Sequence, residues 1–321
     1  MKVCISIDMD NYGDYQSLID PKGHAPGVSF YSDAVPRYLD ALDEVGARAT
    51  FFMIGRDGKR AEDRAAVRSI VERGHEIGNH SYSHPYNFRY LPRPRKEAEI
   101  QQGGDAIADI VGERPVGFRT PSGDLDLETL SILWERGYLY DSSVIPSPLL
   151  VWAFKVYGWV FVRREGYNLG QFWTPLAPPW PYLPSARTLH RPAAPDEERP
   201  AHVIEIPVSA LPLLRVPFYA TLLRMFPPRV FDWTVRAHGQ KRPMLHMLFH
   251  LIDLFDLKGT SLERALQRAP GLGVPVRRRR AFVAHAFARM TAQGEAITLR
   301  ALAREHLERN ALAPGSGRSG V

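Results

Sequence analysis

Short apolar runs alternate with longer stretches of helical periodicity over the first 143 residues. An apolar run of a few residues between turn signals is typical of a buried strand, whereas apolar residues every three or four positions predict an amphipathic helix. This pattern predicts strands at residues 3–7, 49–54, 75–78, 115–118 and 138–140, and helices at residues 31–45, 61–73, 96–111 and 127–136. Strands that alternate with helices favour an α/β fold with parallel strands and the helices outside.

The alternation stops after residue 143 and returns after residue 243. Residues 144–242 are rich in proline and aromatic side chains, and within them residues 202–208 have the clearest strand pattern. Further on, strands are predicted at residues 244–250 and 296–299, and helices at residues 277–290 and 300–309. We therefore expect one domain over residues 1–313, interrupted by a proline- and aromatic-rich insertion at 144–242, and a flexible tail at 314–321.

The composition narrows the function classes. The chain has 321 residues, a formal net charge of +6 and a single cysteine, Cys4, which excludes a disulfide framework and a cysteine-based zinc site. Neither a signal peptide nor an apolar run of membrane-spanning length is recognised, so we expect a cytoplasmic protein, with peripheral membrane contact still open. The basic run at 277–280 has no nucleic-acid-binding motif beside it and is expected to decorate a helix start, so we expect no nucleic-acid partner.

Two carboxylates close the first predicted strand. Asp8 and Asp10 are two residues apart, so the alternation of an extended chain directs both to the same side. Carboxylates placed side by side repel each other unless a cation or an arginine lies between them. Arg119, which follows the fourth predicted strand, is a candidate for that positive partner.

His80 and His84 follow the third predicted strand and are four residues apart. Two imidazoles and one carboxylate are a typical ligand set for a catalytic divalent metal, and a second carboxylate is then free to act as a base. His250 ends a late predicted strand, where it is a candidate general acid. An α/β barrel places its active site at these carboxyl ends of the strands.

These residues together resemble the polysaccharide deacetylase family, carbohydrate esterase family 4. The family's first motif is similar to Ser6-Ile7-Asp8-Met9-Asp10, although here one residue separates the acidic pair. That variant resembles the branch that contains the peptidoglycan-deacetylase-like and cytoplasmic lipid-linked-sugar deformylase enzymes. The second, third and fifth motifs resemble His80-Ser81-Tyr82-Ser83-His84, Arg119-Thr120-Pro121 and Leu248-Phe249-His250, and the fourth resembles Tyr140-Asp141-Ser142-Ser143 more loosely.

The resemblance implies a distorted, incomplete (β/α) barrel of about seven strands as the catalytic domain. It also implies a metal site formed by Asp10, His80 and His84. The metal would be Zn²⁺, although the same ligands accept Co²⁺ or Ni²⁺.

The resemblance also assigns roles around that metal. Asp8 would take a proton from metal-bound water, Arg119 would hold Asp8, and His250 would protonate the departing amine. The backbone N–H of Ser122 would help to bind the oxyanion, and Asp141 would contact the substrate. Tyrosine is frequent in the family at the position of Ser122, so a stacking or capping ring is lost here.

The expected substrate is an acylated amino sugar, from which an N-acetyl or N-formyl group is removed. Residues 211–229 mix apolar bulk with arginines, which suits an anionic membrane surface or a lipid diphosphate, so a lipid-linked or glycolipid sugar is favoured. A buried helix or an oligomer interface would explain the same segment. Two alternatives remain for the whole protein: an allantoinase-like amidohydrolase acting on a small C–N substrate, and a catalytically inactive glycan-binding module.

Overall fold

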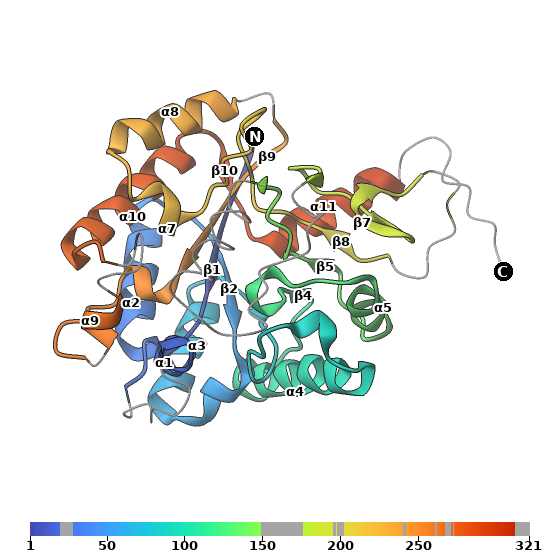
Figure 1. The fold of residues 1–321 in the computed structure, drawn as a ribbon, viewed down its shortest axis with the longest axis horizontal. Coiled ribbons are helices and arrows are strands. Elements are labelled where there is room, and N and C mark those ends of the chain that lie inside the picture. The colour runs from blue at the N-terminus through green and yellow to red at the C-terminus, as the bar shows by residue number, and fades with distance from the viewer. Residues whose placement is uncertain are drawn as a thin grey trace.

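The computed structural model describes residues 1–19, 28–148, 176–194, 197, 202–239, 242–260, 262–266, 271 and 273–311. The predicted tail at 314–321 and part of the predicted insertion, residues 149–175 among them, lie outside the described residues. Figure 1 shows the strands at the centre of the molecule and the helices around their outside.

A curled parallel sheet forms the centre of the fold. Its strands are β1 (Lys2–Asp8), β2 (Thr50–Met53), β3 (Glu76–Asn79), β4 (Gly117–Phe118), β5 (Tyr140–Asp141), β8 (Ile204–Glu205), β9 (Met244–His250) and β10 (Glu295–Ala296). The order runs from β1 through β2, β3, β4 and β5 to β8, while β9 pairs with β1 along its whole length and β10 pairs with the start of β1. The curled sheet is a half-barrel, which confirms the predicted incomplete (β/α) barrel.

Four helices in the first half of the chain, α2 to α5, agree with the predicted periodicity. The described helices are α1 (Tyr12–Ile19), α2 (Tyr31–Glu44), α3 (Ala61–Glu72), α4 (Arg93–Val111), α5 (Leu127–Glu135), α7 (Ala220–Leu223), α8 (Pro228–His238), α9 (Leu262–Leu266), α10 (Val276–Thr291) and α11 (Leu299–Ala311). Helices α1, α7, α8 and α9 were not predicted, and neither was the antiparallel hairpin of β6 (Pro184–Ser185) and β7 (Thr188–Pro192). The strand predicted at 296–299 is wrong in extent, because β10 ends at Ala296 and α11 already begins at Leu299.

Residues 144–242 contribute a strand to the sheet, since β8 pairs with β5. The same region bridges the open side of the half-barrel between β8 and β9. The backbone N–H of Ser209 donates to the carbonyl of His246 at 3.0 Å, and the N–H of Leu248 donates to the carbonyl of Phe218 at 3.0 Å. This region is thus tied directly to the strand that ends in His250.

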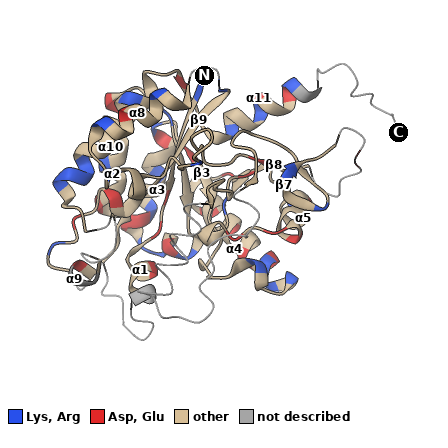
Figure 2. Cartoon of the chain, turned by 45° about the horizontal axis from the view of Figure 1, so that its top comes forward, with Lys and Arg blue, Asp and Glu red and all other residues tan. Residues whose placement is uncertain are grey.

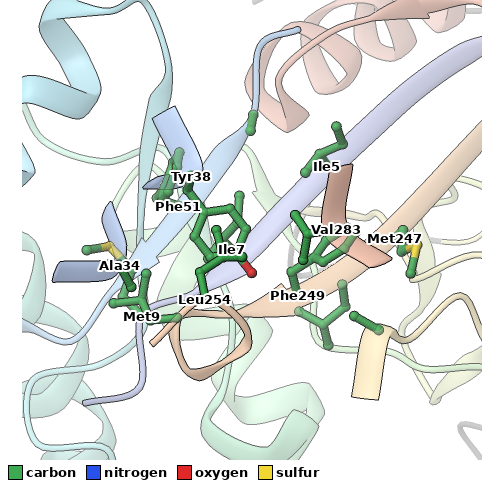
Figure 3. Close-up of a cluster of buried hydrophobic side chains, with 14 of the residues drawn as sticks. Ile5, Ile7, Met9, Ala34, Tyr38, Phe51, Met247, Phe249, Leu254 and Val283 are labelled. Carbon is green, nitrogen blue, oxygen red and sulfur yellow. The ribbon is translucent and has the colours of Figure 1, made fainter. Parts of the chain in front are cut away.

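Successive side chains of β1 point alternately to the hydrophobic core under the helices and to the barrel interior. Ile5 and Ile7 are buried among α2, β9 and α10, where Figure 3 shows them beside Phe249 and Val283. Ser6 and Asp8 point to the other side of the strand, into the barrel. One strand therefore supplies both the apolar contacts that hold the helices and the polar groups of the interior.

The positive charges of the run at 277–280 are divided between solvent and core. Figure 2 shows Lys and Arg on α8, α10 and α11, on the outside of the molecule. Arg277 and Arg278 are exposed, as predicted for a helix start. Arg279 is instead buried and donates to the backbone carbonyls of Ile252 and Phe255, so this arginine braces the turn after β9.

Candidate metal and hydrolytic site

The polar residues predicted from the sequence converge at the carboxyl ends of the parallel strands. Asp8 ends β1, and its register partner on β9 is His250. His80 directly follows β3, and Arg119 directly follows β4. Because parallel strands all end on the same side of the sheet, residues far apart in the sequence meet there.

Asp10, His80 and His84 form a group whose candidate ligand atoms all lie within 4.8 Å of one another. Nε2 of His84 lies 3.3 Å from Oδ1 of Asp10, and Nε2 of His80 lies 3.7 Å from the same oxygen. That carboxylate oxygen is buried and has no hydrogen-bond partner among the described residues. Burial raises the pKa of Asp10 well above its usual value, and the charges of Asp8 and Asp14 add to this. A bound cation would satisfy the oxygen and remove the repulsion, so these residues fit a divalent metal.

A backbone carbonyl orients the imidazole of His80, and an acidic side chain lies near that of His84. His80 donates through Nδ1 to the carbonyl of Arg119 at 2.8 Å, which leaves Nε2 free as a ligand. Nδ1 of His84 lies 3.7 Å from Oδ1 of Asp14, which pairs with Arg56. Neither Asp14 nor Arg56 was predicted from the sequence. The spacing of Asp14, four residues after Asp10, is a signal that could have found it.

The loop that carries the two histidines is fixed by Glu99, which was also not predicted. This carboxylate, on α4, accepts hydrogen bonds from the backbone N–H groups of Tyr82 and Ser83 at 3.1 and 2.7 Å and from the Ser83 hydroxyl at 2.6 Å. His84 itself has a left-handed φ of 51°, which is uncommon for a residue with a side chain. Glu99 therefore helps to hold a loop conformation that brings His84 back toward His80.

Asp8 lies beside this group and is held by Arg119. Nη1 of Arg119 donates to Oδ1 of Asp8 at 2.5 Å, and the guanidinium lies 4.2 Å from the centre of the Phe52 ring. Burial raises the pKa of Asp8, but the charge and hydrogen bond of Arg119, together with the neighbouring His80 and His250, outweigh it, so this pKa falls below its usual value. Oδ2 of Asp8 faces Nε2 of His80 at 3.9 Å. Asp8 is therefore an ionised carboxylate with one oxygen held and the other directed toward the histidines.

His250 faces the same carboxylates from β9. Its Nε2 lies 3.6 Å from Oδ2 of Asp10 and 3.9 Å from Oδ2 of Asp8. The ring of Tyr219 packs edge-on against the imidazole, with centroids 5.6 Å apart. Burial lowers the pKa of His250. The imidazole is thus fixed in orientation and can exchange a proton with a group bound between it and the carboxylates.

Ser122 and Asp141, the two residues expected to contact the oxyanion or the substrate, differ in burial. Ser122 is half-buried, in the turn that follows Thr120, and has a left-handed φ of 58°. Asp141 is fully buried and accepts from the backbone N–H and the hydroxyl of Ser143, both at 2.9 Å. The Ser143 hydroxyl accepts from the N–H of Thr120 at 2.8 Å. In this arrangement Asp141 braces the segment after Arg119 and is enclosed by protein.

Glu205 is a further buried acid that the sequence did not single out. It lies on β8 beside Asp141, and its Oε1 accepts from the N–H of Val144 at 3.0 Å. Burial and the neighbouring charge of Asp141 raise the pKa of Glu205 well above its usual value. A protonated Glu205 can donate to Asp141, so the two carboxyl groups act together as a brace.

Part of the chain matches a known protein family. Residues 25–140 match the family model for polysaccharide deacetylase. The matched range contains His80, His84 and Arg119, whereas Asp8, Asp10 and His250 lie outside it.

Two curated relatives match parts of the chain. A peptidoglycan deacetylase-like protein of Gibberella zeae is 29% identical over 45% of this chain and 44% of its own length. The peptidoglycan deacetylase of Helicobacter pylori is 26% identical over 44% of this chain and 49% of its own length. This chain therefore spans about half the length of the curated relatives that it matches.

Among solved structures, a Mycobacterium smegmatis protein described as a polysaccharide deacetylase aligns with a TM-score of 0.57 and 20% identity. The alignment covers 100% of this chain and 94% of that protein. At this identity the likeness concerns the fold. The family model and the curated relatives confirm the family resemblance found in the motifs, and the solved structure supports the fold.

Proposed function

Because residues 25–140 match the polysaccharide deacetylase family, we propose that the protein is a metal-dependent amide hydrolase that removes an N-acetyl or N-formyl group from an amino sugar. The observation that carries this proposal is the convergence of two kinds of group on one space. Asp10, His80 and His84 supply a metal-ligand set, and Asp8 and His250 face the same space with their reactive atoms. The proposal includes one catalytic domain over residues 1–313, with residues 144–242 as its insertion.

The residues divide the work of amide hydrolysis between them. When bound at Asp10, His80 and His84, a divalent metal, for which we propose Zn²⁺, would polarise the amide carbonyl and make water more acidic. Oδ2 of Asp8 accepts the proton of the attacking water, since Oδ1 is already occupied by Arg119. His250 delivers a proton to the amide nitrogen, because a neutral amine leaves far more readily than its anion. The N–H of Ser122 is proposed to stabilise the oxyanion.

The proposed substrate is a lipid-linked or glycolipid sugar, met at the inner face of the membrane by a cytoplasmic enzyme. None of the described helices is long and apolar enough to cross a bilayer. In the segment 211–229, Leu213 is 99% exposed and Leu214 is 64% exposed, and Met225 and Phe226 are also exposed. Exposed apolar side chains next to arginines are suited to an anionic lipid surface.

Not every arginine of that segment faces solvent. Arg224 is buried and pairs with Asp253, so it stabilises the turn after β9 instead of meeting lipid. Arg215 and Arg242 line a cavity of about 450 Å³ together with Trp180 and Leu213. This cavity, with cationic and apolar walls, is the proposed place for an anionic lipid head group.

The direct test is release of free amine from acetylated and formylated amino sugars, offered both as soluble oligosaccharides and linked to a polyprenyl phosphate. We expect hydrolysis by the zinc-loaded protein, a preference for the lipid-linked form and loss of activity in Asp8→Asn. Hydrolysis of allantoin instead would favour the small-substrate alternative. Glycan binding without hydrolysis would favour the inactive binding module.

Comparing two substrates with different leaving groups tests whether His250 acts as the proposed acid. Removal of His250 in His250→Ala should greatly slow hydrolysis of an amide but spare para-nitrophenyl acetate, because its phenolate leaves without protonation. Equal losses on the amide and the ester would contradict the acid role.

Vesicle flotation tests the proposed membrane contact separately from the proposed hydrolysis. The wild-type protein should float with vesicles that contain anionic phospholipid and less with purely zwitterionic ones. Leu213→Ser/Leu214→Ser should weaken flotation while hydrolysis of a soluble sugar is unchanged. A wild-type protein that stays in the soluble fraction with both vesicle types would overturn the membrane contact.

A further inference from the structure

A layer of buried polar groups lies directly below Asp8 and His250 in the half-barrel. The register of β1 and β9 pairs Asp8 with His250, and Ser6 and His246 precede them by two and four residues on the same side of their strands. Ser6 and His246 are both fully buried. Neither touches the metal-ligand group, and the family motifs give His246 no role, so the sequence alone marks it as a core histidine.

The hydrogen-bond directions in this layer follow from the chemistry of the partners. Nδ1 of His246 lies 2.9 Å from the carbonyl oxygen of Pro207, which can only accept, so Nδ1 carries the proton. In the neutral ring Nε2 then accepts, and its partner at 2.8 Å is the hydroxyl of Ser6. Burial lowers the pKa of His246 to about 3, which agrees with a neutral ring.

The orientation of Ser6 in turn fixes Arg119. Because its only proton is donated to His246, the Ser6 oxygen presents lone pairs, and Nη2 of Arg119 donates to it at 3.0 Å. Nη2 also donates to the hydroxyl of Ser142 at 2.9 Å, and Nε donates to the carbonyl of Ser142 at 2.7 Å. With these positions occupied, Nη1 is the group that reaches Oδ1 of Asp8.

We propose that His246 and Ser6 are positioning residues, which set the rotation of the Arg119 guanidinium so that it holds Oδ1 of Asp8 and leaves Oδ2 for the reaction. His246 acts by accepting the Ser6 proton, since a Ser6 hydroxyl that pointed toward Arg119 would place two donors against each other. The catalytic consequence rests on the proposed function, whereas the arrangement of His246, Ser6 and Arg119 can be tested without any activity.

Two substitutions at position 246 separate positioning from packing. His246→Gln keeps an acceptor near the position of Nε2, whereas His246→Leu fills similar space without one. We expect His246→Leu to lower kcat by about 100-fold with little change in KM, because a misplaced base is costly even when the mutation is remote. His246→Gln should recover most of that loss.

Further variants test the link through Ser6. Ser6→Ala should resemble His246→Leu, and the double variant should lose little more than either single one, because both break the same connection. His238→Leu is the matched control, since His238 is an equally buried histidine on α8 whose Nε2 donates to the carbonyl of Met244. This control should change kcat per folded molecule little.

Nitrogen NMR of the histidines and of the Arg119 Nε–H gives a readout that needs no substrate. We expect His246 to remain the neutral Nδ1–H tautomer from about pH 8 to about pH 5, where an ordinary histidine becomes protonated. The Arg119 signal should shift in His246→Leu and Ser6→Ala but not in His246→Gln or His238→Leu. An inactive wild type would overturn the proposed function alone, and the Arg119 signal would still decide the positioning role.

Any one of four results would overturn the proposal. His246→Gln could be as impaired as His246→Leu, which would show that the acceptor is irrelevant. The double variant could lose the product of the two single losses. The NMR signals could report a protonated His246, or an Arg119 signal unchanged in Ser6→Ala.

Discussion

Along β1 and β9, the two ends of the barrel interior carry different kinds of side chain. At the amino ends of the strands, Cys4, Met244 and Ile204 belong to one buried apolar cluster. At the carboxyl ends, the same strands β1 and β9 present Asp8 and His250. Along β1 the side chains that face the interior change from the apolar Cys4 through Ser6 to the charged Asp8, within four residues. The same strands therefore contribute to stability at their amino ends and to the proposed chemistry at their carboxyl ends.

The largest expected effect comes from the polar end. Asp8→Asn keeps the shape of the side chain but removes the base, so activity should fall by about 100-fold to about 10,000-fold. Metal content should be retained, because Asp8 is not one of the proposed ligands. The measurement is kcat/KM on an acetylated amino sugar, with metal content by mass spectrometry.

Asp105→Asn is the control for this substitution. Asp105 also pairs with an arginine, Arg114, but both side chains are exposed at the surface. The same chemical change there should leave kcat/KM within about twofold, since exposed ion pairs contribute little. Equal effects of Asp8→Asn and Asp105→Asn would contradict the base role of Asp8.

Substitution at the apolar end should act on stability instead. Ile204 on β8 is fully buried, so Ile204→Ala should lower the free energy of unfolding by about 2–5 kcal/mol, and Ile204→Val by about 0.5–1.5 kcal/mol. The folded fraction should retain normal kcat/KM. Urea unfolding with activity normalised to folded protein checks this, and a loss of kcat larger than the loss of folded protein would show that the two ends are coupled.

Two buried neutral histidines make the free energy of unfolding depend on pH, with a smaller effect than the substitutions above. Burial lowers the pKa of His75 to about 4 and that of His246 to about 3. The unfolded chain takes up these protons near pH 6.5, so it binds more protons than the folded chain below that pH. Stability is therefore full above about pH 6.5 and falls as the pH drops, by up to about 1.4 kcal/mol per pH unit for each histidine.

His75→Gln should reduce this slope between about pH 6.5 and about pH 4, the range in which His75 contributes. His75 is suited to the test because it lies just before β3, at the opposite end of that strand from His80. The measurement is the urea midpoint at several pH values. An unchanged slope would mean that His75 is already protonated in the folded protein.

Most elements of the first 143 residues, although not α1, could be predicted because strands, helices and turn residues there agree with one another. The predicted ligands Asp10, His80 and His84 meet, and Arg119 and His250 reach Asp8, because each follows a parallel strand. The region 176–242 was less predictable, since short elements such as β8 and α7 have too few residues for periodicity to show.

Other contributors to the site could not be predicted from local patterns. Glu99 and Glu205 are acids on a helix and on a short strand, and nothing in their neighbouring residues distinguishes them from surface acids. Their contacts with Ser83 and Val144 depend on tertiary packing. The same is true of His246, whose link to Arg119 through Ser6 requires the register between β1 and β9.

Metal content tests the central claim most directly. Wild-type protein, Asp10→Ala and His80→Ala should each be prepared without chelator or affinity-tag metal and measured by mass spectrometry. The account predicts about one zinc per wild-type chain, as for a single site with three protein ligands, and its loss in both variants. A wild-type protein that contains no metal, and stays inactive after zinc is added, would contradict the account.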